Sequence, residues 1–421
     1  MKVTGCAVYN GRVKQGRRSR SWPMARLMSL AVILGLAFLP EAARAVRPQR
    51  TVFHTQPVEW NPEVDEDHKP PALVFQPSWT WNGFKAPLAG DPVLCAGSIV
   101  AASRDGDVVA IVPSTGEIRW RASLAEAVTV GPATDGTLVF QVSARGRLRA
   151  LQGLDGQPAW SIDLPETTAV PIRVVGGRVL VGTVDGVLVS VDARSGRIAA
   201  RQTLPGRPST APEAAPGTLL IGTDHGFVMA LDDSTLETRW KHAVGPAVTS
   251  PPVFHDGRVY FAAADRTIRC LRFRSGRQRW RARLGAVSTA RPIALTPYLY
   301  VLCYDNDIYV LNGRNGHQLT RVRLGHRLDS DPLMTEDHLM VVPFTEASVV
   351  GLALPKLETV GRYALEAPGE WFTTSPLWID DQIAVGYGRS EGRILALKVS
   401  RQKPEPAGSG SPSGEPRQPG S

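Results

Sequence analysis

Few residues of this chain have the types and spacing that catalysis or metal binding requires. The four cysteines include no adjacent pair and no Cys-x-x-Cys spacing, and the eight histidines are scattered along the 421 residues. Zinc and haem sites hold their ligands at short, fixed spacings, and no His-Glu-x-x-His or P-loop sequence is present. The sequence therefore predicts no catalytic residue, no metal ligand and no cofactor-binding residue.

The most distinctive polar segment is GHRLDSDP, residues 325–332. It carries Arg327, Asp329 and Asp331, whereas the corresponding segment of an earlier repeat, GPAVTSPP at 245–252, has no acid. The repeat itself does not require these acids, and one interpretation is a partner-docking or ion-binding loop. The other, which the residue types favour, is a solvated loop in which aspartates simply favour turns.

Two aromatic residues could extend the same surface. Trp371 and Phe372, which follow Glu370, open the final repeat of the chain. Aromatic side chains commonly anchor protein partners. We therefore expect an exposed aromatic pair on the same side of the fold as the acidic loop.

A forty-residue repeat must position these candidates. An aliphatic residue recurs at that spacing, and in four repeats a Trp lies four residues before it. The aliphatic positions are Leu124, Leu164, Leu204, Val244, Leu284 and Leu324, and the aromatic ones are Trp120, Trp160, Trp240 and Trp280. Each repeat holds four short apolar runs separated by turns rich in Gly, Asp and Asn, which is the pattern of antiparallel strands joined by hairpins. Four strands in each repeat predict a β-propeller blade.

The number of blades depends on the ends of the repeat region. Complete repeats run from residue 85 to residue 365, and residues 366–400 supply three further strands. The missing strand is expected from ALVFQPSWTWNGF, which contains Trp79 and Trp81. Its pairing with the C-terminal strands would close the ring and cover open edges. We predict an all-β propeller of eight four-stranded antiparallel blades over residues 73–400.

The periodic tryptophans have a structural interpretation. Their strict spacing favours packing between neighbouring blades over contact with a ligand. The predicted docking set is Trp81, Trp120, Trp160, Trp240 and Trp280.

The first 45 residues have the organisation of a secretory signal. Basic residues precede the apolar run LMSLAVILGLAFL, and an Ala-Arg-Ala triplet ends at Ala45, where we expect cleavage. Translation from Met24 would give a signal of more ordinary length. The thirteen apolar residues are too few for a membrane-spanning helix, which needs about 20. We expect a flexible leader over 46–72 and a disordered Pro/Gly/Ser-rich tail over 401–421.

Signal cleavage would remove most of the net charge. Residues 1–45 contain eight basic residues and one acid, so the formal charge falls from +9 to +2 and no nucleic-acid partner is expected. Cys270 and Cys303 could form a disulfide or remain reduced and buried. No cysteine follows the apolar run at cleavage distance, so the sequence does not support a lipid-modified N-terminus.

The repeat also carries a family resemblance. The segments GDVVAIVPSTGEIRW and GFVMALDDSTLETRW resemble the repeat of quinoprotein-type eight-bladed propellers, and the resemblance covers 73–400. Within that group the chain looks like the outer-membrane assembly factors of the BamB type. This resemblance implies a periplasmic, cofactor-free scaffold that binds the barrel-assembly machinery, as a monomer within a complex. The implied contact residues are Leu204, Arg207, Asp329 and Asp331.

Two other functions remain open at this stage. Dehydrogenases that use pyrroloquinoline quinone share the repeat, but they add adjacent cysteines and long insertions, which this sequence lacks. An exported ligand-binding or sensor propeller is the third interpretation. The scaffold interpretation further requires a host with an outer membrane, which the sequence does not reveal.

Overall fold

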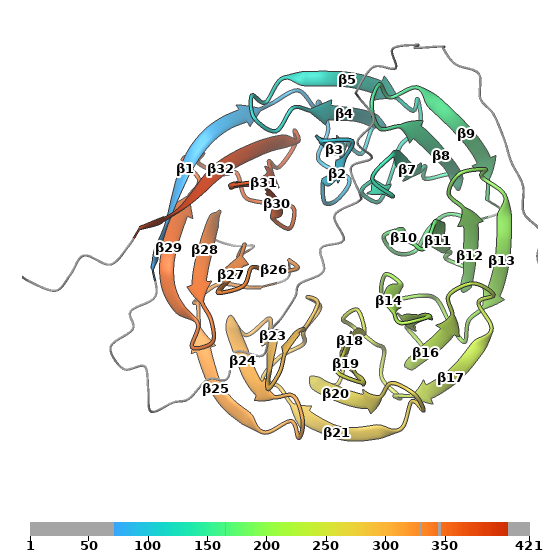
Figure 1. The fold of residues 1–421 in the computed structure, drawn as a ribbon, viewed down its shortest axis with the longest axis vertical. Coiled ribbons are helices and arrows are strands. Elements are labelled where there is room, and N and C mark those ends of the chain that lie inside the picture. Colours follow the sequence, from blue (N-terminus) through green and yellow to red (C-terminus); the bar gives the residue numbers. More distant parts are fainter. Residues whose placement is uncertain (1–70, 165, 329, 344–346, 403–421) are drawn as a thin grey trace, which may run out of the picture. The chain divides into compact units, whose positions relative to one another are not determined.

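The computed structural model describes residues 71–164, 166–328, 330–343 and 347–402, all within one compact unit, Thr51–Ser421. These residues form eight four-stranded antiparallel sheets arranged as the blades of a ring, and this part of the chain has no helix (Figure 1). The predicted eight-bladed propeller is confirmed. Consequently, no helix of the described residues is long and apolar enough to cross a bilayer.

The first four blades follow one strand order, from the ring axis outwards. Blade 1 contains β2 (Val93–Cys95), β3 (Ser98–Ala102), β4 (Asp107–Ile111) and β5 (Ile118–Ser123). Blade 2 contains β6 (Ala133–Thr134), β7 (Leu138–Val142), β8 (Arg147–Gln152) and β9 (Pro158–Asp163). Blade 3 contains β10 (Arg173–Val175), β11 (Arg178–Gly182), β12 (Val187–Asp192) and β13 (Ile198–Thr203). Blade 4 contains β14 (Glu213–Ala215), β15 (Thr218–Gly222), β16 (Phe227–Asp232) and β17 (Thr238–Ala243).

The next three blades repeat the same order. Blade 5 contains β18 (Val253–His255), β19 (Arg258–Ala263), β20 (Thr267–Arg272) and β21 (Gln278–Arg283). Blade 6 contains β22 (Ile293–Leu295), β23 (Tyr298–Leu302), β24 (Asp307–Asn312) and β25 (Gln318–Arg323). Blade 7 contains β26 (Leu333–Met334), β27 (His338–Val341), β28 (Ser348–Ala353) and β29 (Glu358–Ala364).

Blade 8 is built from both ends of the described chain. Its inner strands are β30 (Leu377–Ile379), β31 (Gln382–Tyr387) and β32 (Arg393–Gln402), and its outermost strand is β1 (Ala72–Trp81). β1 pairs with β32 from Ala72–Gln402 to Trp81–Ile394, with a register shift between Pro77 and Trp79. The N-terminal segment that contains Trp79 and Trp81 therefore supplies the outermost strand of blade 8.

The core lies between blades, where second and third strands are buried on both faces. Every residue of β3 is buried, and each of the eight apolar clusters draws residues from two neighbouring blades. In blades 1 to 7 the outermost strand carries a register shift, as between Ala110 and Ile111 opposite β5. Such a bulge redirects the side chain beside it, here Trp120, towards the next blade.

The two faces of the ring carry different turns. The "connection face" holds the segments that join one blade to the next, together with the turns between second and third strands. The "hairpin face" holds the turns between first and second strands and those between third and fourth strands. The expected signal, most of the leader (46–70), most of the tail (403–421) and Asp329 lie outside the described residues.

Candidate functional site

The predicted contact residues all belong to connection-face segments, but these segments are far apart around the ring. Leu204 and Arg207 lie between β13 and β14, Arg327 and Asp331 between β25 and β26, and Trp371 between β29 and β30. The structure therefore brings the second and third groups into neighbouring junctions. It leaves the first group three junctions away from the second.

Two of the predicted contact residues are buried. Leu204 is 5% exposed and fills the same core position as Leu124 and Leu164. Phe372 is 2% exposed and packs edge-on against Tyr387, with ring centroids 6.3 Å apart. The expected exposed aromatic pair is therefore wrong, because the bridge that joins Phe372 to Tyr387 turns this side chain into the core.

The other contact residues reach the surface in fixed positions. The backbone N–H and the Nε of Arg207 donate to the carboxylate of Asp224 at 2.8 and 2.9 Å. Arg327 stacks on the ring of Tyr304, 3.9 Å from its centroid, and Arg389 lies 5.4 Å from the ring of Trp371. The arginines thus have oriented guanidinium groups, which suit recognition of a carboxylate.

One position recurs in every blade just before the innermost strand. Its occupants around the ring are Asp91, Gly131, Pro171, Ala211, Pro251, Arg291, Asp331 and Ser375. Four of them, in blades 6, 7, 8 and 1, are linked by hydrogen bonds. The N–H of Arg291 donates to Asp331 at 2.8 Å, that of Asp331 to Ser375 Oγ at 3.2 Å, and that of Ser375 to Asp91 at 2.8 Å.

We call Asp91, Arg291, Asp331 and Ser375 the polar arc. Gly, Pro and Ala at the other four positions have no side-chain acceptor, so this linkage covers only half of the ring. A cavity of about 350 Å³ opens beside the arc and is lined in part by Asp91, Asp331 and Ser375. Asp331 therefore ties blade 6 to blade 7, a structural role that its spacing from Asp329 did not predict.

A buried carboxylate and two partly exposed arginines form an ion cluster between blades behind the arc. Glu213, on innermost strand β14, is 6% exposed, and its carboxylate lies 3.0 Å from Arg291 and 3.6 Å from Arg173. Burial raises the pKa of Glu213, and the two arginines oppose that shift. This "axial cluster" of Arg173, Glu213 and Arg291 was not predicted from the sequence. The sequence did contain a signal for Glu213, because the residues at its position in blades 1 and 5 are the apolar Val93 and Val253.

The tryptophan contacts repeat from blade to blade. Trp120 Nε1 donates to the Gly153 carbonyl at 2.9 Å, and its indole lies against Gly156 in the next blade. Trp160, Trp240 and Trp280 donate in the same way at 2.9, 2.6 and 3.1 Å.

At the ring closure this contact is made by Trp79 and not by Trp81. Trp79 Nε1 donates to Pro113 O at 2.6 Å, and its indole lies against Gly116. Trp81 packs edge-on against Phe84, with ring centroids 4.7 Å apart. The register shift in β1 explains the difference, because it places Trp79 opposite Ala396, as Trp120 lies opposite Ala110.

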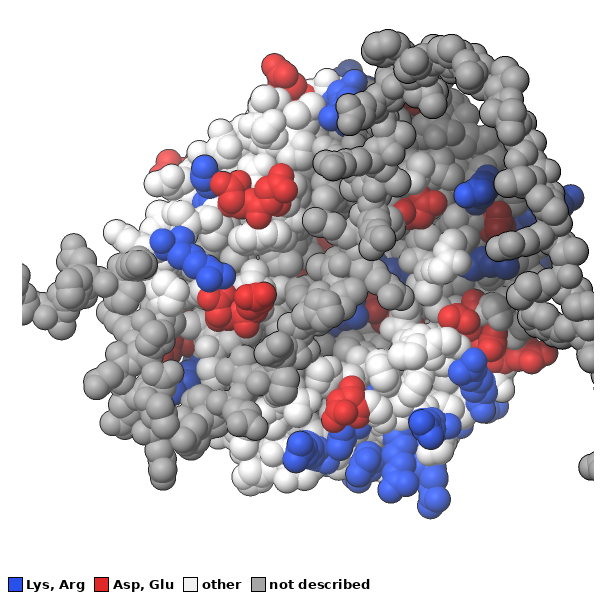
Figure 2. Space-filling model, in the orientation of Figure 1, with Lys and Arg blue, Asp and Glu red and all other residues white. Residues whose placement is uncertain are grey.

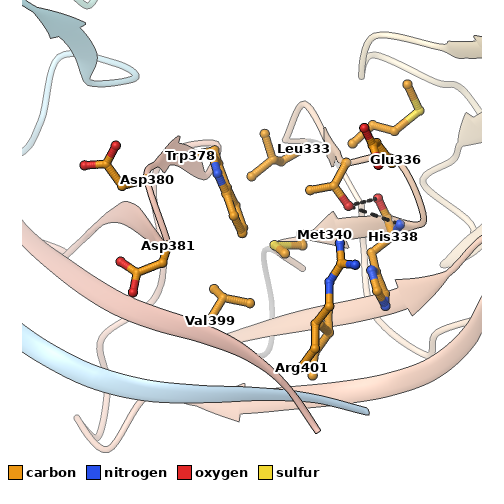
Figure 3. Close-up of a pocket in the computed structure, with 12 residues that line it drawn as sticks. Leu333, Glu336, His338, Met340, Trp378, Asp380, Asp381, Val399 and Arg401 are labelled. Atoms are coloured by element: carbon orange, nitrogen blue, oxygen red, sulfur yellow. Dashed lines mark hydrogen bonds between the residues drawn. The ribbon is translucent and has the colours of Figure 1, made fainter. Parts of the chain in front are cut away.

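A larger cavity separates blades 7 and 8 on the hairpin face. Gly361 replaces the docking Trp in blade 7 and is covered by Leu73 of β1, and blade 8 has no turn between its two outer strands because they come from different chain ends. The cavity measures about 590 Å³, within the usual range for small-molecule sites. Figure 3 shows the Trp378 indole between the acids of the following turn and the side chains of Leu333 and Met340.

The cavity combines an apolar wall with a charged rim. Its apolar lining is Leu73, Leu333, Met334, Met340, Trp378 and Val399, and its ionisable lining is Glu336, His338, Asp380, Asp381 and Arg401. His338 is 1% exposed; its Nδ1 lies 2.7 Å from Asp337, and its Nε2 has no partner among the described residues. The site can therefore accept an apolar group that carries a positive charge.

The remaining candidates for chemistry have structural roles. Residues 388–392 read Gly-Arg-Ser-Glu-Gly, a nucleophile-elbow pattern that was overlooked in the sequence. They form the hairpin turn between β31 and β32, and within the described residues Ser390 makes no hydrogen bond to a histidine. The described cysteines are free and buried, so Cys270 and Cys303 are not bridged, and burial raises the pKa of Cys270 to about 12.

The fold and its repeated Trp–Gly contacts define an eight-bladed propeller of the PQQ-like repeat type. The chain belongs to the family described as outer membrane protein assembly factor BamB, whose model matches residues 73–215, 184–296 and 266–400. No curated protein sequence matches the chain.

Three solved structures show the same fold. BamB from Moraxella catarrhalis is 19% identical with a TM-score of 0.66, covering 77% of this chain and 100% of that one. The computationally designed Ika8 protein is 14% identical with a TM-score of 0.66, covering 76% and 99%. Quinohemoprotein alcohol dehydrogenase from Comamonas testosteroni is 13% identical with a TM-score of 0.63, covering 81% and 78%. At these identities the likeness concerns the fold alone.

Proposed function

We propose that this protein is an exported, non-enzymatic scaffold that assists the assembly of outer-membrane β-barrel proteins. The family match over 73–400 carries this proposal. The expected signal over 1–45 would deliver the chain to the periplasm, where such a partner lies. The protein would act there through a protein interface and without a cofactor.

The connection face is the surface that we assign to the partner. It carries the residues that break the repeat, and three of them, Arg207, Arg327 and Trp371, present charged or aromatic groups there. Arginine and tryptophan are the side chains that most often dominate protein interfaces. The turns of the hairpin face follow the repeat more closely and serve as a comparison surface.

Charge reversal on the connection face should weaken partner binding. We expect the R207E/R327E variant to recover at least tenfold less barrel-assembly component from a mild-detergent envelope extract than the natural protein, because both guanidinium groups are lost from the interface. Recovery is measured by affinity pull-down followed by quantitative mass spectrometry.

The matched control is R194E/R197E on the hairpin face, where both arginines are exposed at the turn between β12 and β13. It should recover the partner as the natural protein does. If the natural protein recovers no barrel-assembly component, the scaffold proposal fails. Equal losses in both variants would remove the connection face from the proposal.

A ligand-binding or sensor propeller is a second candidate, favoured by the cavity between blades 7 and 8. Its acids and the face of Trp378 suit a cation, and its apolar lining suits a hydrocarbon body. An aromatic or aliphatic amine has both features. This function would require no turnover.

Phenylalkylamines should bind this cavity and raise the thermal midpoint. At a concentration of about 100 Kd the stabilisation should reach about 2.7 kcal/mol, and the Trp378 fluorescence should change. Phenylalkyl alcohols of the same length lack the charge and should bind more weakly. L333W, which fills the cavity from its wall, should abolish the shift; an unchanged shift in that variant would place the ligand elsewhere.

A further inference from the structure

Blade 5 carries an unusual excess of positive charge. Residues 253–283 contain nine arginines and only two acids, Asp256 and Asp265, which bind Arg258 and Arg269. Seven of these arginines are exposed, and we call them the blade 5 arginine surface: Arg266, Arg272, Arg274, Arg277, Arg279, Arg281 and Arg283. The chain as a whole is far less biased, since it holds 48 basic and 39 acidic residues.

The surface runs along the whole outer edge of the blade. Arg279, Arg281 and Arg283 alternate along outermost strand β21 and therefore point to one side of it. Arg272, Arg274 and Arg277 surround the turn between β20 and β21, and Arg266 occupies the turn at the opposite end. Figure 2 shows basic side chains gathered over this edge of the ring.

Within the described residues, none of these seven side chains forms an ion pair or a side-chain hydrogen bond. Arg281 interacts with Asp265 only at longer range, through its charge. Arg269 differs because it is 4% exposed and bonded to Asp265 at 2.7 Å. Like charges held close together repel each other. Binding of an anionic partner would therefore lower the electrostatic repulsion between these arginines.

Several acids of the neighbouring blades already bind arginines of their own blade. In blade 4, Asp232 binds Arg239 at 2.8 Å. In blade 6, buried Asp307 binds both Arg321 and Arg323. These carboxylates are therefore occupied within their own blades and do not pair with the arginines of blade 5.

The shape of the arginine surface favours a lipid bilayer over an acidic peptide as its anionic partner. β21 is the outermost strand of its sheet, and neither of the two cavities described above is lined by any of the seven arginines. An acidic peptide bound along such an edge strand also needs pockets that receive its side chains. A bilayer instead offers many phosphate groups on a flat surface, and it needs only exposed charge.

We propose that the blade 5 arginine surface binds the anionic headgroups of a lipid bilayer. Trp280 and Ala282 alternate with the arginines but face the neighbouring blade, so no large apolar side chain of β21 is available for insertion. The contact is therefore electrostatic and peripheral. It holds the ring with its edge against the membrane and leaves both faces open to protein partners.

Vesicle co-sedimentation of the full chain tests this proposal. Vesicles of phosphatidylglycerol and phosphatidylcholine should bind the protein, and R274Q/R277Q/R281Q should bind them roughly 100-fold more weakly at low salt. The lysine variant R274K/R277K/R281K should retain binding, because the interaction depends on charge. Raising the salt concentration should weaken binding of the natural protein and reduce the difference.

The repeat supplies a matched control. Arg194, Arg197 and Arg201 occupy the same positions in blade 3, two repeats earlier, and are also exposed. R194Q/R197Q/R201Q removes the same charge and should reduce vesicle binding far less, because blade 3 lacks the other exposed arginines. Both variants keep the N-terminal basic residues, so that segment does not affect the comparison.

Two outcomes would overturn the proposal. One is equal vesicle binding by the blade 5 and blade 3 variants. The other is arginine-dependent binding to polyglutamate with no binding to anionic vesicles, which would assign the surface to an acidic protein. Neither outcome bears on the R207E/R327E pull-down, so membrane binding and partner binding can fail separately.

Discussion

Replacing Trp120 by alanine should lower the free energy of unfolding by about 4 kcal/mol. The indole is 7% exposed, donates to Gly153 O at 2.9 Å and packs against Gly156 in the next blade. Its removal would leave a cavity between two blades and would also leave the Gly153 carbonyl without its side-chain donor. This loss should exceed that of any other substitution discussed, because the contact joins two blades.

Chemical denaturation followed by circular dichroism measures the effect. Trp371→Ala is the control: this side chain is only partly buried, so its loss should cost about 1 kcal/mol. A repeat protein can lose cooperativity when one interface weakens. A broadened transition in Trp120→Ala alone would therefore also support the packing role. A change below about 1 kcal/mol in that variant would contradict it.

The ring could be predicted because its determinants recur. One repeat specifies four strands, three turns and a Trp that reaches the next blade, and the same pattern returns every forty residues. The prediction failed at Trp79, because Trp79 and Trp81 lie 41 and 39 residues before Trp120 and a forty-residue spacing does not choose between them. The choice is made by the pairing of β1 with β32, whose register shift matches those of the other blades and places Trp79 opposite Ala396.

The candidate site was harder to predict, because its residues come from different blades and lie close together only when the ring is closed. Arg173, Glu213 and Arg291 come from blades 3, 4 and 6, and only closure of the ring brings their charges together. The cavity between blades 7 and 8 is likewise lined by residues of two blades and of both ends of the described chain. Burial of Phe372 depends on Tyr387 across a bridge. Each of these features can be recognised only in the three-dimensional structure. Residues that depart from the repeat nevertheless indicate the positions at which such features occur.

The axial cluster gives the second large expected effect. Arg291→Met should destabilise the fold by about 3 kcal/mol at pH 7, because Glu213 would keep its buried charge with only Arg173, 3.6 Å away, to compensate it. Adding Glu213→Gln should restore most of this loss, because the double variant buries no carboxylate. Glu213→Gln alone should cost little, since Arg173 and Arg291 are 39% and 44% exposed and can be rehydrated.

The pH dependence separates this explanation from a simple packing defect. The folded-state pKa of Glu213 is raised above its ordinary value of 4.5, so the folded state binds this proton more tightly than the unfolded chain does. The contribution of Glu213 to stability is therefore greatest below that ordinary pKa and is lost as the pH rises through the raised folded pKa. Loss of Arg291 raises the folded pKa further, so the destabilisation by Arg291→Met should shrink towards zero near pH 4 and grow towards pH 7. Urea denaturation of all four proteins at both pH values measures this. If the loss is independent of pH, or if the double variant is as unstable as Arg291→Met, then Arg291 acts through its packing and not through its charge.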